Sequence, residues 1–221
     1  MIDFRFEILQ DAFPVLWEGT LVTLKIALGA FVLAVAIGTV VGIARSSSPK
    51  LSLFFTPYVE IFRGTPLLTQ LFFIYYGLPT VGLITDSMTA AYIGLGLNSG
   101  AYISEIIRGS LNAVDRGQRE AAYALGMSRF QSMRLIILPQ AMSVAIPPLV
   151  NSFSSLLKDT TLVSVLAITE LTRVGQLIYT RTFRAFEVYL AIGVLYFLMT
   201  YAASWCSRYL EQKFRIEGRS A

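Results

Sequence analysis

The chain has 221 residues, of which 55% are hydrophobic and 14% charged, with a formal net charge of +4 and a mean hydropathy of +0.62. Soluble domains carry about 25% charged residues, so the composition predicts an all-α protein that crosses a membrane several times. There is no histidine and a single cysteine, Cys206, which excludes histidine-dependent hydrolysis, histidine-ligated metal sites and an intramolecular disulfide.

Residues 1–20 interleave acidic side chains with large apolar ones. The pattern is amphipathic and lacks the basic region and short apolar core of a cleavable signal peptide. We expect this N-terminal segment to lie along the membrane interface, with Trp17 as an anchor.

Five apolar segments reach the roughly 20 residues that a helix needs to cross a bilayer. They are residues 21–44, 53–76, 88–107, 141–168 and 188–209. Neither an internal repeat nor a low-complexity linker divides the chain. We therefore expect one five-span domain over 21–210, followed by a short tail over 211–221.

The basic residues of the loops predict the orientation of these spans. With the N-terminus outside, the inner segments carry 11 Lys and Arg residues, and the outer segments carry four, namely Arg5, Arg173, Arg181 and Arg184. Because cytoplasmic loops carry the excess of basic residues, we expect the N-terminus outside the cell and the C-terminal tail in the cytoplasm. The charged segment 109–140 then faces the cytoplasm.

Segment 109–140 has the pattern of two short helices separated by a glycine. Asp115 to Gln118 and Ser128 to Gln131 both have the spacing of a capping box. Gly126 suits the C-terminal stop of the first helix, and we expect the second helix to end near Pro139.

The first of these helices carries Glu120, Ala121, Ala122 and Ala124. Its small side chains allow another protein surface to approach the backbone closely. We interpret it as a docking helix on the cytoplasmic side.

Polar residues form a stripe in each of two spans. Asn98, Tyr102 and Glu105 are spaced by four and three residues, so they share one face of the third span, and we assign the adjacent Ala101 to the same pathway. The fourth span carries the second stripe, which is Asn151, Ser152, Ser155, Lys158 and Asp159. Two such stripes could surround a zwitterionic solute, because polar groups within a membrane usually line a pathway or pair with each other.

A purely structural role is the alternative for the charged members of these stripes. Glu105 can pair with Arg108, Glu60 with Arg63, and Asp159 with Lys158 or with a neighbouring helix, only to hold the bundle together.

Two proline-containing sites are expected to interrupt helices, Gly64-Thr65-Pro66 in the second span and Pro147-Pro148 in the fourth. A broken helix at membrane depth exposes backbone groups, which is tolerated only beside a cavity or a neighbouring protein. A simple kink without ligand contact is an equally good interpretation.

Signatures of enzymes are absent from the sequence. It contains no His-Glu-x-x-His, no Gly-x-Ser-x-Gly and no Gly-x4-Gly-Lys-[Ser/Thr] phosphate loop. If ATP drives this protein, a separate chain must bind the ATP and its Mg²⁺, and no cofactor or metal is expected here. Nucleic-acid binding is not expected either, because no basic patch with stacking aromatics appears.

The string EAAYALGMSRFQSMRLIILPQA, from Glu120 to Ala141, resembles the EAA loop of inner-membrane permease subunits of bacterial ABC importers. Four further strings are similar to the polar-amino-acid branch of that family: IFRGTPLLTQLFFIYYGLP (61–79), AYISEIIRG (101–109), DRGQREAA (115–122) and LLKDTTL (156–162). The phrases FIYYGLP and NSFSSLLKDTTL look most like permeases for cystine and related polar amino acids.

The resemblance implies a type I importer (MetI-like) fold with five spans, in a homodimer or in a heterodimer with a sister permease. It also implies two cytoplasmic ATPase subunits and an extracytoplasmic solute-binding protein as partners. Glu120, Ala121, Ala122 and Gly126 match the coupling helix that sits in a groove on each ATPase and drives alternating access. Family members with a known site in the membrane place it between the third and fourth spans and the broken second span.

Two other functions fit a small polytopic chain. A proton- or sodium-coupled secondary transporter transports solute by itself and normally has more spans and internal pseudo-symmetry. A non-transporting scaffold subunit shows no dependence on solute.

Overall fold

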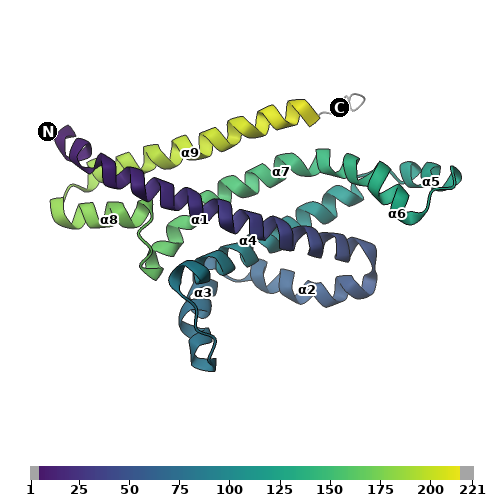
Figure 1. The fold of residues 1–221 in the computed structure, drawn as a ribbon, viewed down its shortest axis with the longest axis horizontal. Coiled ribbons are helices and arrows are strands. Elements are labelled where there is room, and N and C mark those ends of the chain that lie inside the picture. The colour runs from purple at the N-terminus through teal and green to yellow at the C-terminus, as the bar shows by residue number, and fades with distance from the viewer. Residues whose placement is uncertain (1–4, 215–221) are drawn as a thin grey trace.

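The computed structural model describes the backbone of residues 5–214 and the side chains of residues 5–206 (Figure 1). No strand occurs in these residues, and the expected all-α fold class is confirmed. The α-helices are α1 (Phe6–Ser47), α2 (Pro49–Gly64), α3 (Leu67–Phe72), α4 (Ser87–Asn112), α5 (Arg116–Ala124), α6 (Arg129–Ser132), α7 (Leu138–Asp159), α8 (Leu171–Thr182) and α9 (Ala185–Phe214). Two π-helical turns, η1 (Phe73–Gly77) and η3 (Met133–Ile137), and two 3₁₀ helices, η2 (Leu78–Val81) and η4 (Thr160–Leu166), complete the element order.

The long helix α1 forms the axis of the molecule, and α4 packs along it in the same direction (Figure 1). Their contact is built from glycines. A Cβ atom at Gly38 would lie 2.5 Å from Ile103 Cγ2, and a Cβ atom at Gly42 would lie 2.7 Å from the carbonyl oxygen of Ser104. Small residues let two membrane helices approach this closely, so that dispersion contacts hold them together where lipid offers no hydrophobic drive.

Three helices in the described residues have the length and hydropathy of a membrane span, Phe6–Ser47, Arg129–Leu166 and Ala185–Cys206. They correspond to the first, fourth and fifth expected spans. The second expected span is divided between α2 and α3, and α4 has 26 residues but is not apolar enough to qualify. Length and composition therefore do not identify five spans, and that number stays a prediction.

The helix α1 is continuous across residue 20, where the sequence suggested a boundary between an interfacial segment and the first span. Ala12 and Leu16 are buried against α8 and α9, in one cluster with Leu171, Val174 and Val188. Of the tail expected over 211–221, residues 211–214 form the end of α9, and 215–221 lie outside the described residues.

Two expected helix interruptions are wrong. Pro147 and Pro148 lie inside α7, which runs through both, and the helix does not end at Pro139 but continues from η3 into α7. Neighbouring helices and local π adjustments allow membrane helices to tolerate proline. The π turn η3 ends two residues before Pro139, and η1 ends two residues before Pro79, each closed by an N–H to a carbonyl five residues earlier.

We predict that Gly38→Leu destabilises the protein by about 1–3 kcal/mol, the usual cost of overpacking, because the added atoms meet Ile103 and the backbone of Gly100. Thermal unfolding of the purified protein in nanodiscs measures the effect. The matched control is Gly193→Leu, because no atom lies within 4 Å of a Cβ at Gly193. Equal melting temperatures for the two variants would contradict the packing described for α1 and α4.

Candidate functional site

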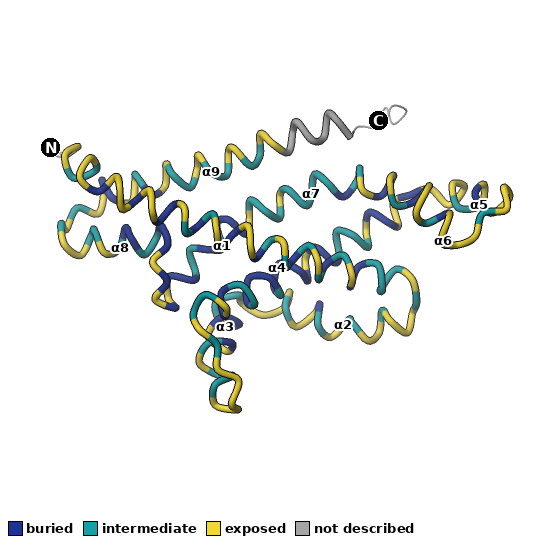
Figure 2. Tube along the Cα trace, viewed as in Figure 1, coloured by how far each residue is buried: buried dark blue, intermediate teal, exposed yellow. Residues whose placement is uncertain are grey.

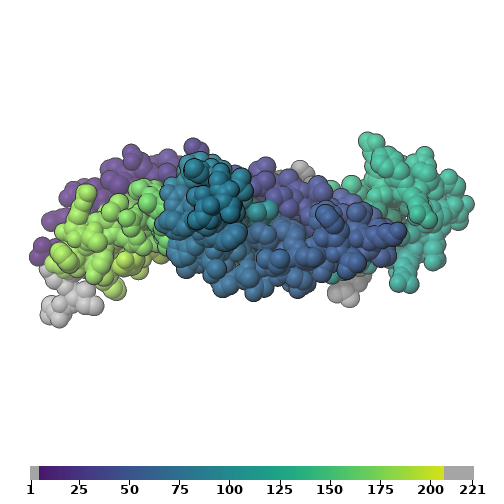
Figure 3. Space-filling model, turned by 90° about the horizontal axis from the view of Figure 1, so that it is seen from below, coloured from purple at the N-terminus to yellow at the C-terminus, as the bar shows by residue number. Residues whose placement is uncertain are grey.

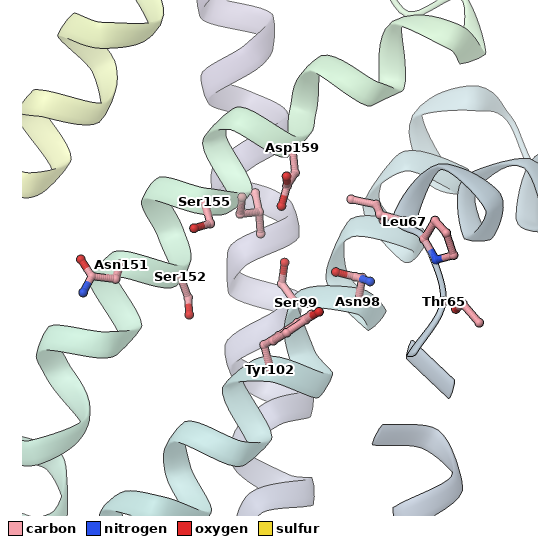
Figure 4. Close-up of a pocket in the computed structure, with 11 residues that line it drawn as sticks. Thr65, Leu67, Asn98, Ser99, Tyr102, Asn151, Ser152, Ser155 and Asp159 are labelled. Carbon is pink, nitrogen blue, oxygen red and sulfur yellow. The ribbon is translucent and has the colours of Figure 1, made fainter. Parts of the chain in front are cut away.

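A cavity of about 520 Å³ lies where the break after α2 faces α4 and α7 (Figure 4). Its volume is within the range of about 300–1,000 Å³ that is typical of sites for small molecules. Its wall combines hydroxyl, amide and carboxylate groups with apolar side chains. The lining residues are Thr65, Pro66, Leu67, Asn98, Ser99, Tyr102, Asn151, Ser152, Ser155, Leu156 and Asp159.

The first wall of the cavity is the break itself. α2 ends at Gly64, and Thr65 and Pro66 are extended, with ψ angles of 149° and 134°, before α3 begins at Leu67. The break leaves the carbonyl groups of Phe62 and Thr65 without helical donors. The side-chain amide of Gln70 donates to both of them, at 2.9 and 3.1 Å.

The second wall is α4, which contributes Asn98, Ser99 and Tyr102. Asn98 Nδ2 donates to the carbonyl oxygen of Phe62 and to Gln70 Oε1, both at 3.0 Å. Tyr102 lies beneath Arg63, whose guanidinium carbon is 5.4 Å from the ring centroid. Hence α4 both supports the break and presents polar groups to the cavity.

Two predicted pathway residues of α4 lie outside this wall. Ala101 is completely buried in helix packing. Glu105 forms ion pairs with Arg45 of α1 and with Arg108, the latter at 2.7 Å. Glu105 thus has the pairing with Arg108 that the structural interpretation of the sequence expected, and it also joins α4 to α1.

The third wall is α7, with Asn151, Ser152, Ser155 and Asp159. In Figure 4 the carboxylate of Asp159 points from α7 toward α4. Lys158, also assigned to the pathway from the sequence, is exposed and does not line the cavity. Of the three helix-break residues, Thr65 and Pro66 line the cavity and Gly64 does not.

Sequence reasoning missed Gln70 among the residues that shape this site. It is only 8% exposed, and it lies four residues after Pro66 in a largely apolar run. A buried amide one turn after a helix break is a usable signal, because the carbonyls freed by the break need donors.

The segment 109–140 projects as a knob from one end of the molecule, as the space-filling view shows (Figure 3). Asp115 Oδ1 caps α5 by accepting from the N–H of Gly117 at 2.7 Å, whereas the Gln118 side chain accepts from Gln140 instead of closing a capping box. The box from Ser128 to Gln131 is complete. Between the two helices, Gly126 has a φ of 77°, the left-handed conformation that glycine adopts without strain.

The outer surface of α5 and α6 is exposed (Figure 2). Glu120, Ala121 and Gly126 lie on it, and Ala122 is buried beneath it. Large apolar side chains are also exposed there, including Leu125 at 79% and Phe130 at 71%. Exposed apolar side chains grouped on a charged knob are typical of a protein interface.

The knob is joined to the helices that line the cavity through a buried cluster of Leu111, Val114, Ile137 and Ala141. Leu111 belongs to α4 and Ala141 to α7. Arg119 of α5 also donates to the carbonyl oxygen of Leu111 at 3.2 Å. Buried contacts and this hydrogen bond therefore connect α5 to two of the three walls.

The described residues contain no group of three or more His, Cys, Asp or Glu side chains that could hold a metal ion.

Comparisons with known proteins agree over nearly the whole chain. Residues 34–216 match the family model described as binding-protein-dependent transport system inner membrane component. The glutamine transport system permease protein GlnP of Escherichia coli K12 is 38% identical over 97% of this chain and 100% of its own length. The probable amino-acid permease protein YxeN of Bacillus subtilis is 41% identical over 90% of each chain. The L-cystine transport system permease protein TcyB of Bacillus subtilis is 36% identical over 94% of this chain and 90% of its own.

Solved structures confirm the MetI-like fold. A chain from the crystal structure of an amino acid ABC transporter with histidines superposes with a TM-score of 0.89 at 38% identity, covering 96% of this chain and 100% of that one. A chain of the inward-facing MetNI methionine ABC transporter superposes with a TM-score of 0.74 at 19% identity, covering 96% and 100%, which supports the fold alone. The chain therefore belongs to the family of binding-protein-dependent transport system inner membrane components, the permease subunits of ABC importers.

Proposed function

We propose that this chain is the permease subunit of an importer that moves a polar amino acid inward by alternating access, driven by ATP hydrolysis on a separate subunit. The observation that carries the proposal is the polar cavity between the broken helix, α4 and α7. A zwitterion needs donors and acceptors together, and hydroxyl, amide and carboxylate groups converge there in an otherwise apolar protein.

The residues proposed to contact the solute are those that line the cavity. Of the candidates from the sequence, Asn98, Tyr102, Asn151, Ser152, Ser155 and Asp159 meet this condition. Ala101 and Glu105 are assigned to the helix packing around the cavity instead, and the exposed Lys158 is not assigned to the solute site. Relatives named for glutamine and for L-cystine support a polar amino acid as cargo.

We assign Glu120, Ala121, Ala122 and Gly126 to the coupling surface for the ATPase. Their segment is exposed, and the buried cluster beneath it reaches α4 and α7. Closure of the ATPase subunits on ATP and Mg²⁺ would move α5, and the cluster would carry that movement to the cavity walls. No covalent step takes place in this chain.

The basic-residue bias supports an outer N-terminus and a cytoplasmic C-terminus.

The remaining partners follow from the same proposal. The exposed apolar side chains of α9, among them Phe197 at 63% and Trp205 at 63%, suit contact with lipid or with a second permease, identical or homologous. An extracytoplasmic solute-binding protein would deliver the amino acid.

Reconstitution into proteoliposomes with the partner ATPase and binding protein tests the function. We expect a polar amino acid to stimulate ATP hydrolysis and to accumulate inside, and we expect neither effect without the ATPase. Uptake by the chain alone, driven by an ion gradient, would make it a secondary transporter. Hydrolysis that responds to no solute would make it a scaffold.

Gly126→Asp is expected to uncouple hydrolysis from uptake. A side chain at a φ of 77° costs about 1–2 kcal/mol, and the carboxylate adds charge to the docking surface. Gly82→Asp is the matched control, because Gly82 has a φ of 88° and lies outside the coupling segment. A Cβ atom added at Gly82 or at Gly126 would have no neighbouring atom within 4 Å. Uptake per ATP that stays normal in Gly126→Asp would overturn the coupling assignment.

Asp159→Asn is expected to raise the KM for uptake about tenfold, ~1.4 kcal/mol, because it removes the negative charge that lines the cavity. Initial rates of uptake at several solute concentrations measure the change. Glu60→Gln, an exposed carboxylate of α2 outside the cavity, serves as the control. The same KM in both variants would argue against contact between Asp159 and the solute.

A further inference from the structure

Two buried side-chain amides meet at the cavity wall, Asn98 in the lining and Gln70 behind it. Gln70 and Asn98 are 8% and 7% exposed, and Asn98 Nδ2 donates to Gln70 Oε1 at 3.0 Å. An amide can be turned by 180° in its site, which exchanges donor and acceptor, so the hydrogen-bond network must decide its orientation. Here the network leaves one choice for each amide.

The orientation of Gln70 follows from the broken helix. The hydroxyl of Thr65 donates its proton to the carbonyl oxygen of Ile61 at 2.7 Å, so Thr65 Oγ1 can only accept from Gln70 Nε2, which lies 2.8 Å away. The carbonyl oxygens of Phe62 and Thr65, the other two partners of Nε2, also only accept. The NH₂ group of Gln70 must therefore face the break, and its oxygen must face α4.

The orientation of Asn98 follows from that of Gln70. On this side Asn98 meets two acceptors, Gln70 Oε1 and the carbonyl oxygen of Phe62, each 3.0 Å from Nδ2. Its NH₂ group must face them, because the opposite orientation would set oxygen against oxygen. The oxygen of Asn98 is consequently turned into the cavity, as Figure 4 shows.

The carboxylate of Asp159 faces the same space from α7 (Figure 4). When ionised it accepts hydrogen bonds and donates none. Asn98 Oδ1 and this carboxylate are therefore two acceptors that line the same cavity, and the ionised carboxylate is negatively charged. A group that presents several N–H donors and a positive charge is complementary to this pair.

We propose that Gln70 is a positioning residue that holds the Asn98 oxygen in the cavity, where Asn98 and Asp159 together bind the ammonium group of the transported amino acid. The inference rests on the proposed function. It adds that the ammonium end of the zwitterion is recognised by Asn98 and Asp159. The carboxylate of the solute is then left to the hydroxyl groups on the remainder of the wall, including Ser152 and Ser155 of α7.

Binding to the permease–ATPase complex in nanodiscs, without the solute-binding protein, tests this assignment. Isothermal titration calorimetry would compare three probes: L-glutamine, glutaramic acid, which lacks only the α-ammonium, and 4-aminobutanamide, which lacks only the α-carboxylate. In the wild type we expect 4-aminobutanamide to retain more of the affinity for L-glutamine than glutaramic acid does.

Gln70→Met and Asn98→Leu are the test variants, and Gln176→Met on α8, whose side chain accepts from Arg173 at 3.3 Å, is the matched control. We expect both test variants to weaken L-glutamine and 4-aminobutanamide at least tenfold and to leave glutaramic acid within twofold of its wild-type affinity. Unchanged binding of glutaramic acid also reports that the cavity is intact. The control should bind all three probes as the wild type does.

Two results would overturn the inference. One is wild-type protein that binds glutaramic acid as tightly as L-glutamine, and the other is a test variant that weakens all three probes equally, as a merely structural role of the amides predicts. Both results leave the proposed function standing, since that function is tested separately by amino-acid-stimulated ATP hydrolysis and ATPase-dependent uptake in the reconstituted transporter.

Discussion

The structure depends on one constraint, that backbone groups within a membrane must find partners inside the protein. The break at Gly64–Pro66 leaves carbonyl groups without helical donors, and Gln70 and Asn98 supply the donors. Since Asn98 belongs to α4, satisfying the break joins two helices that are distant in sequence. The cavity lies directly beside this joint, so the backbone requirement also shapes the candidate solute site.

A rigid frame connects that site to the knob formed by residues 109–140. α1 and α4 approach so closely that a Cβ atom at Gly38 or Gly42 would overlap its neighbours, and the ion pair between Arg45 and Glu105 joins the same two helices. Densely packed elements of this kind move as units. The buried cluster of Leu111, Val114, Ile137 and Ala141 gives the proposed coupling surface a continuous path of contacts to α4 and α7.

Much of the candidate site could be predicted from the sequence, because helical periodicity determines which residues share a face. The spacing of Asn98 and Tyr102, and that of Asn151, Ser155 and Asp159, grouped residues that line one cavity. The same spacing grouped Glu105 with them, but Glu105 does not line the cavity. Glu105 shares the face but lies two turns further along α4, where the arginine of the adjacent α1 takes up its charge.

The sequence by itself determined the helical class, the family and the left-handed turn at Gly126, because hydropathy, motif spacing and local backbone chemistry depend on residues close together in the chain. Only the tertiary structure decided that α7 runs through Pro147 and Pro148 and that α1 is continuous. It also decided the role of Gln70, whose hydrogen-bond partners lie at the break after α2 and on α4. The reason is physical. The function of a buried polar group depends on its hydrogen-bond partners in space, and sequence spacing specifies those partners only within a single helix.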